Sequence, residues 1–261
     1  MTRPPITLYA FPVSHFAEKV RWLFDHEGIA YHEVDWIPLF SAPQAYWKTG
    51  KRTVPFLEVE QGSNRFVVHD STEILLWAAE RFGPIELMPE DPALFEAAMA
   101  IEDRVDGVGE DVIRYMYAPM TRFPNDFVEI WGWGASRFRK RLLRTAVPLI
   151  RQAMTRVIGF SPSQCVAGSQ RIHAVFADLD RRLADGRPFL LGDRFSIADV
   201  SAASLLAPVL TPPEHEVYAS NFFQASLRSS QREFTSYRSF EWLRSIYRDH
   251  RRSGSRSRST A

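Results

Sequence analysis

The spacing of apolar positions changes near residue 83, and this change divides the chain into two parts. Before it, short apolar runs predict strands at 6–11, 29–34, 55–59 and 66–69. Apolar residues at helical spacing predict helices at 15–27 and 71–82, with a short helix near Ala45. The order is strand, helix, strand, followed by strand, strand, helix. The first three elements form a βαβ unit, whose two strands are expected to be parallel.

Helical periodicity dominates the second part, and we predict no strand there. Helices are expected at 93–117, 126–158, 170–184, 196–206 and, with weaker patterning, 218–249. Three prolines with acidic residues between them make 84–92 a linker. The predicted fold class is therefore α+β: a βαβ-ββα domain at 1–83, the linker, and an all-helical domain at 93–250. A Ser/Arg-rich tail at 251–261 is expected to be disordered.

Composition narrows the class of protein without naming a function. The formal net charge of +1 gives no bulk electrostatic argument for nucleic acid or a membrane as a partner. No apolar run approaches the roughly 18 residues of a membrane helix, and the N-terminus lacks a signal-peptide segment. The one cysteine, Cys165, excludes an intrachain disulfide and a multi-cysteine metal site, and we expect it to be buried. These features predict a soluble, cytoplasmic protein without a metal.

Positive charge is nevertheless concentrated in two segments. Residues 137–156 hold seven arginines and lysines and no acid, and residues 248–261 hold five arginines against Asp249. The first segment could bind an anionic substrate or nucleic acid, but we interpret it as a solvated helix face or a partner for acids on a neighbouring helix. Within the second segment, the Ser/Arg-rich part at 253–259 is interpreted as a mobile terminus, with contact to RNA as the alternative.

One candidate binding motif surrounds Pro55, which interrupts the strand-like run at 53–57. A proline cannot donate a hydrogen bond to a neighbouring strand. A cis bond before Pro55 would leave the backbone N–H and C=O of Val54 open to an extended peptide. The alternative is a trans proline on an edge strand.

Asp70 and Ser71 form a second candidate motif, because they open a predicted helix with unpaired N–H groups and a partial positive charge. Ser71 could hold a carboxylate and Asp70 an ammonium group, the two charges of an α-amino acid. The alternative is a capping box with Glu73. Ser14, between the first strand and helix, lies either at a ligand-binding sheet edge or only at a helix N-cap.

Four segments in this order resemble the soluble glutathione transferases. They are LYAFPVSHFA at 8–17, TVPFL at 53–57, DS at 70–71 and FLLGDRFSIAD at 189–199. The likeness covers 6–82 and 170–207, whereas 118–168 and 208–261 match no segment of that family. It implies a thioredoxin-like N-terminal domain followed by a helical domain, and a homodimer.

The resemblance also implies roles for five residues. Glutathione would be the co-substrate, held by the backbone of Val54 before a cis Pro55, and by Asp70 and Ser71 at its γ-glutamyl end. Ser14 would lie by the sulfur and activate the thiol for attack on a hydrophobic electrophile. The helical domain would supply the second substrate site. The alternative is a non-catalytic glutathione- or ligand-binding protein in which Ser14 is only a cap.

The chain departs from the family pattern at several positions. Asp70 replaces the commoner Glu, which shortens the reach of the carboxylate to an amine. Thr53 stands where a Lys or Gln often contacts the tripeptide, although Lys51 or Arg52 could reach its carboxylates. Tyr9 is a second possible hydroxyl donor, but strand alternation directs it to the opposite face from Ala10, so we rank it below Ser14.

Overall fold

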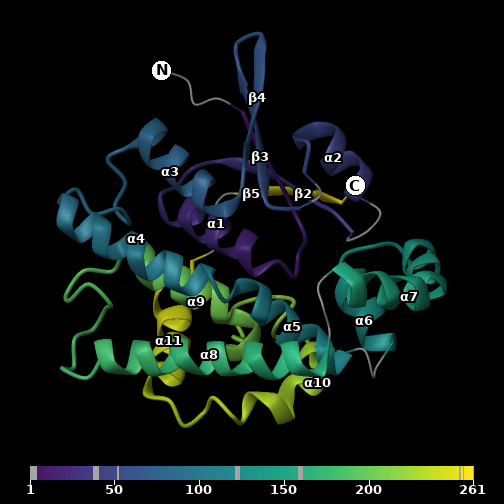
Figure 1. Ribbon diagram of the computed structural model, residues 1–261. Helices are drawn as coiled ribbons and strands as arrows, with labels where there is room; N and C mark the ends of the chain where they lie inside the picture. The colour runs from purple at the N-terminus through teal and green to yellow at the C-terminus, as the bar shows by residue number, and fades with distance from the viewer. Residues whose placement is uncertain are drawn as a thin grey trace. The chain divides into compact units, whose positions relative to one another are not determined.

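A computed structural model describes residues 5–37, 41–51, 53–120, 124–157, 161–252, 254 and 256–260. The chain forms two compact units, which are described separately. Unit 1 comprises residues 1–88 and 252–261, and unit 2 comprises residues 89–251. The division lies inside the segment predicted as a linker. Figure 1 shows the elements of both units.

Unit 1 is a thioredoxin-like α+β domain with the predicted βαβ-ββα order. Its elements are β1 (Ile6–Ala10), α1 (His15–His26), β2 (Tyr31–Asp35), α2 (Ala42–Thr49), β3 (Phe56–Gln61), β4 (Asn64–His69), α3 (Ser71–Phe82) and β5 (Arg256–Thr260). The strand order is β4-β3-β1-β2-β5. β1 is parallel to β2, and β3 is antiparallel to both β1 and β4.

Alternation along the strands separates the two faces of this sheet. Glu33 in β2 accepts a hydrogen bond from Arg21, so its face carries α1. Tyr9 pairs with the residue after Glu33, and its side chain therefore points to the opposite face. There it stacks on Phe56, which belongs to a buried cluster with Ala45 of α2.

The C-terminal tail, expected to be disordered, instead contributes the strand β5, parallel to β2. Arginine and serine alternate along it, and this alternation matches the two faces of a strand. On one face Arg258 forms an ion pair with the buried Asp35 and donates to its Oδ1 at 3.1 Å. On the other face the two ring nitrogens of His32 lie 2.8 and 2.9 Å from the hydroxyls of Ser257 and Ser259. The composition of the tail suggested disorder, but its contacts with β2 order it.

Unit 2 is all-helical in its described residues. Its helices are α4 (Pro92–Asp106), α5 (Gly109–Met120), α6 (Pro124–Trp131), α7 (Arg137–Val157), α8 (Pro162–Arg182), α9 (Ile197–Leu210), α10 (Asn221–Gln231) and α11 (Arg238–His250). Every residue of α9 is buried, and α4, α5 and α11 all pack against this helix. The core of unit 2 therefore forms around α9.

Three helices predicted as single elements are each two helices. The predicted helix 93–117 divides at Gly107 into α4 and α5, and 218–249 divides into α10 and α11. The predicted helix 126–158 divides at a turn in which Gly134 has φ of 71°, a conformation that glycine adopts without strain. Apolar periodicity continues across these breaks, so the pattern alone did not reveal them.

Two further expectations concern burial and membranes. Cys165 lies near the start of α8 and is half-buried rather than buried. In the part of the chain that the structure describes, no helix has both the length and the apolar character needed to cross a bilayer.

Candidate functional site

The topology of unit 1 brings the three candidate motifs to one edge of the sheet. β1 and β4 are both antiparallel to β3, so they run in the same direction. Helix α1 follows β1, with Ser14 as its N-cap, and helix α3 follows β4, with Asp70 as its N-cap. The N-termini of both helices therefore lie at the edge where β1 and β4 end.

The turn before β3 presents an open stretch of backbone. The Val54–Pro55 peptide bond is cis, as predicted. The side chain of Val54 packs against the apolar cluster that contains Trp36 and Phe56. Its N–H and C=O have no hydrogen-bond partner among the described residues. The carbonyl of Pro55 accepts from the N–H of Asp70 at 3.3 Å, which holds the turn beside the start of α3.

Asp70 and Ser71 form the first turn of α3. Asp70 is exposed, has φ of 82°, and accepts from the N–H of Thr72 through Oδ1 at 2.9 Å. It therefore caps the helix through Thr72, and its Oδ2 forms no bond to the described part of the chain. Ser71 is buried, and its hydroxyl likewise has no hydrogen-bond partner within the described ranges. One carboxylate oxygen and one hydroxyl are thus open at this helix N-terminus.

His69, to which the sequence analysis gave no role, holds the turn from the other side. Its Nε2 lies 3.2 Å from both the hydroxyl and the carbonyl oxygen of Thr53. Burial lowers the pKa of His69, and the nearby charge of Lys51 lowers it further, so the ring is neutral at neutral pH. A neutral ring with its proton on Nε2 donates to the Thr53 carbonyl. Lys51 itself is exposed, and Arg52 lies outside the described residues.

Ser14 is the N-cap of α1. Its Oγ accepts from the N–H of Ala17 at 3.2 Å, so the expected cap is present. The residue is half-buried. A hydroxyl that accepts at a cap keeps its own proton, and this proton can still be donated to a ligand. The cap and a ligand contact are therefore compatible at the same oxygen.

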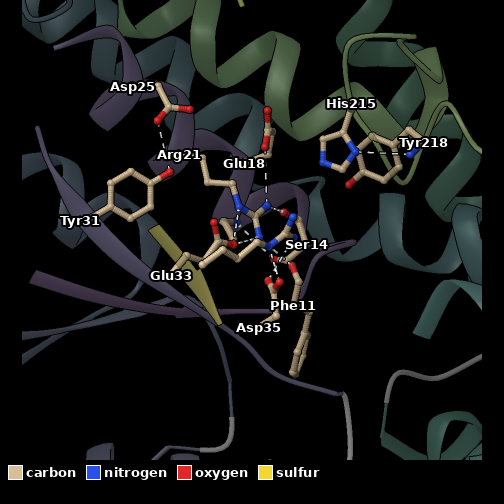
Figure 2. Close-up of polar contacts among 12 residues, drawn as sticks. Phe11, Ser14, Glu18, Arg21, Asp25, Tyr31, Glu33, Asp35, His215 and Tyr218 are labelled. Carbon is tan, nitrogen blue, oxygen red and sulfur yellow. Dashed lines mark hydrogen bonds and ion pairs between the residues drawn. The ribbon is translucent and has the colours of Figure 1, made fainter. Parts of the chain in front are cut away.

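A buried ionic network supports the loop that carries Ser14 (Figure 2). Arg21 donates to the carbonyl oxygen of Phe11 at 3.0 Å and to that of Ser14 at 3.5 Å. It also donates to Glu33 at 2.8 Å, and Glu18 lies 3.6 Å away. Burial opposes the charge of Arg21, but the two carboxylates outweigh burial and raise its pKa. The guanidinium thus ties both ends of the loop between β1 and α1 to the sheet.

Tyr9, the second hydroxyl considered, belongs to the other face of the sheet. Its hydroxyl contacts Lys48 and Glu58, and Lys48 lies 5.0 Å from the centre of its ring. Burial and the charge of Glu58 raise the pKa of Tyr9. The hydroxyl is thus engaged in an ionic cluster with Lys48 of α2 and Glu58 of β3.

Comparison with known proteins identifies the family. Residues 8–86 match the family described as glutathione S-transferase, N-terminal domain, and residues 151–229 match glutathione S-transferase, C-terminal domain. The chain belongs to the glutathione S-transferase family. No curated protein matches it.

Solved structures of low sequence identity share the fold. A glutathione S-transferase from Methylobacterium radiotolerans, in complex with glutathione sulfonate, is 22% identical with a TM-score of 0.56, covering 92% of this chain and 93% of its own. A glutathione S-transferase from Methylobacillus flagellatus with glutathione bound is 16% identical, with a TM-score of 0.55. The match covers 91% of this chain and 98% of the other. FzlA from C. crescentus is 19% identical, with a TM-score of 0.53, and the match covers 85% of this chain and 87% of FzlA.

Proposed function

We propose that this protein conjugates the thiolate of glutathione to a hydrophobic electrophile, and that Ser14 activates the thiol. The observation that carries the proposal is the open backbone of Val54 at a cis proline, held beside the start of α3 by the bond from Asp70 to Pro55. Family membership and the glutathione ligands of the two bacterial structures support the choice of ligand.

Two parts of the tripeptide, the cysteinyl residue and the γ-glutamyl end, have chemical counterparts in unit 1. The N–H and C=O of Val54 would pair with the cysteinyl residue in the manner of an added strand. The hydroxyl of Ser71, with the positive end of α3, would hold the γ-glutamyl carboxylate, and Asp70 would hold the adjacent ammonium group. No metal takes part in this proposal.

The energy needed for thiol activation is within reach of Ser14. A free thiol has a pKa near 8.5, and lowering it by about two units requires roughly 2.7 kcal/mol. A hydrogen bond to a charged group contributes about 1.5–3 kcal/mol, and a helix N-terminus adds about 0.3–1 kcal/mol. In the conjugation the thiolate sulfur forms a bond to the electrophilic carbon, the leaving group departs with its electron pair, and the thiol proton goes to solvent.

A non-catalytic binding protein is the second candidate, because Ser14 is engaged as a cap. The experiment measures glutathione binding by calorimetry and conjugation of an activated aryl halide across a range of pH. For Ser14→Ala we expect unchanged glutathione affinity and a kinetic pKa raised by about 1–2 units, which lowers the rate at pH 6.5 by about 5–50-fold.

Two further variants separate activation from capping. Ser14→Thr keeps the hydroxyl and a capping side chain, so most of the activity should be retained. Ser220→Ala removes an equivalent cap, in which the hydroxyl accepts from Phe223 at 3.3 Å, and should leave the pH profile unchanged. Equal rates in wild type and Ser14→Ala would reject Ser14 as the activating residue, whereas glutathione binding without conjugation in the wild type would favour the binding protein. Failure to bind glutathione would reject the conjugation reaction and any role in binding glutathione.

The homodimer and the second-substrate site in the helical domain remain predictions from the resemblance, and the cytoplasmic location remains a prediction from composition. Sedimentation velocity of the purified protein tests whether it forms the homodimer.

A further inference from the structure

Helix α7 has one face packed inside unit 2 and another face in solvent. Leu143, Val147 and Ile150 are buried, and α7 packs against the neighbouring helix α6. At about 100° per residue, these three side chains occupy one side of the helix. The ordinary apolar face of an amphipathic helix is therefore already used within the fold.

A second apolar stripe runs along the solvent side of α7. Phe138, Leu142 and Leu149 are 76%, 47% and 70% exposed. On a helical projection they fall within about 40° of one another, centred about 130° from the buried face. Single exposed apolar residues need no explanation, but three aligned along about three helical turns form a shared apolar stripe.

Uncompensated positive charge flanks this stripe. Arg137, Arg141 and Arg144 are exposed, and none has a carboxylate partner in the described part of the chain. Lys140 differs from them, because it pairs with Glu129 at 2.5 Å. The sequence contains no acid between Glu129 and Asp178, so α7 carries no negative charge.

We propose that the solvent face of α7 docks on an anionic lipid bilayer. The stripe would enter the boundary between headgroups and acyl chains, while the arginines beside it would contact the lipid phosphates. The net charge of the chain and its lack of long apolar runs predicted no membrane partner, but neither property describes the surface of a single helix. Duplex nucleic acid would pair with the cations yet leave the apolar stripe exposed, and a single convex helix forms no groove for a partner helix.

The test is flotation of the full chain with vesicles of phosphatidylcholine alone or with about 30% phosphatidylglycerol, at low and physiological salt. We expect binding only to the anionic vesicles, and weaker binding as salt rises. Phe138→Ser/Leu149→Ser should lower the partition coefficient at least about tenfold. Arg137→Gln/Arg141→Gln/Arg144→Gln should lower it about a hundredfold at low salt.

Matched controls carry the same changes elsewhere on unit 2. Leu94→Ser/Val166→Ser replaces two other exposed apolar side chains, and Arg228→Gln/Arg232→Gln/Arg238→Gln removes three other exposed cations. Both controls should bind as wild type does.

Four results would overturn the proposal. The first is no binding to anionic vesicles, and the second is equal losses in the control and α7 variants. The third is binding to duplex DNA that survives Phe138→Ser/Leu149→Ser and displaces the vesicles. The fourth is a lower sedimentation mass of that variant without lipid, which would show that a second copy of the chain covers the stripe.

Discussion

Replacing Arg21 tests whether the buried network positions the proposed site. Arg21→Met keeps most of the side-chain volume and removes the bonds to Glu33 and to the carbonyls of Phe11 and Ser14. Glu33 is fully buried and would remain without its main partner. Leaving one charge of a buried pair unpaired costs about 3–5 kcal/mol, so we expect the free energy of unfolding to fall by that amount.

A double variant separates the unpaired charge from the lost loop contacts. Arg21→Met/Glu33→Leu removes both charges, and replacing a whole buried ion pair by apolar groups is often neutral or stabilising. We therefore expect the double variant to be more stable than Arg21→Met by at least about 2 kcal/mol. The Ser14 loop would remain loosened in both, so both should show weaker thiol activation in the conjugation assay.

Urea unfolding followed by circular dichroism measures the stabilities, and the pH profile of conjugation measures the thiol pKa. If Arg21→Met and Arg21→Met/Glu33→Leu are equally stable, the cost does not arise from an unpaired Glu33. If both variants retain the wild-type pH profile, the network does not position Ser14. Arg187→Met, which removes an exposed pair with Asp185, is the control and should change stability by less than about 1 kcal/mol.

Three further predictions concern groups away from Ser14. Tyr9→Phe should lower the free energy of unfolding by about 1 kcal/mol, because its hydrogen bonds are lost, and should leave the pH profile of conjugation unchanged. A loss of activity as large as that of Ser14→Ala would contradict the assignment of Ser14. Burial opposes ionisation of Asp111, but Arg171 and Arg114 lower its pKa below 3.8, so its stabilisation is present above that value and is lost as pH falls through the lowered pKa. Acid unfolding of Asp111→Asn should therefore depend less on pH below about 4, and an unchanged acid transition would refute this. Deleting 256–261 removes Arg258, the ion-pair partner of the buried Asp35. Unit 1 should lose about 3 kcal/mol of stability in urea unfolding. Unchanged stability would mean that β5 contributes nothing to the stability of unit 1.

Features of unit 1 that were predictable from sequence are those specified by nearby residues. Strand alternation and helical spacing gave the βαβ-ββα order. The interrupted strand at Pro55 left cis and trans open, and the resemblance implied the cis bond; an acid-serine pair suggested the start of α3. The edge of the sheet at which Ser14 and Ser71 lie follows from that order, because strand direction decides where each helix begins.

The side-chain contacts that hold the loops of the site in place were not predictable from nearby residues. Arg21 lies on a helix whose spacing predicts an ordinary amphipathic face, and its partner Glu33 is on another element. The role of His69 depends on the register that places it opposite Phe56, and a strand pattern does not specify register by itself. Such contacts depend on tertiary packing, so neither propensity nor periodicity contains them.

The strand β5 shows most clearly why composition misled. Alternating arginine and serine has low β-propensity, and charged side chains at an edge normally discourage strand pairing. Here the neighbouring strand β2 supplies a buried carboxylate, Asp35, on one face and a histidine, His32, on the other. Burial raises the pKa of Asp35 and Arg258 opposes that rise, so Arg258 supplies the positive charge that the buried carboxylate requires. A polar segment of period two should therefore be interpreted against the polar residues of the strand it could join, because pairing depends on both strands.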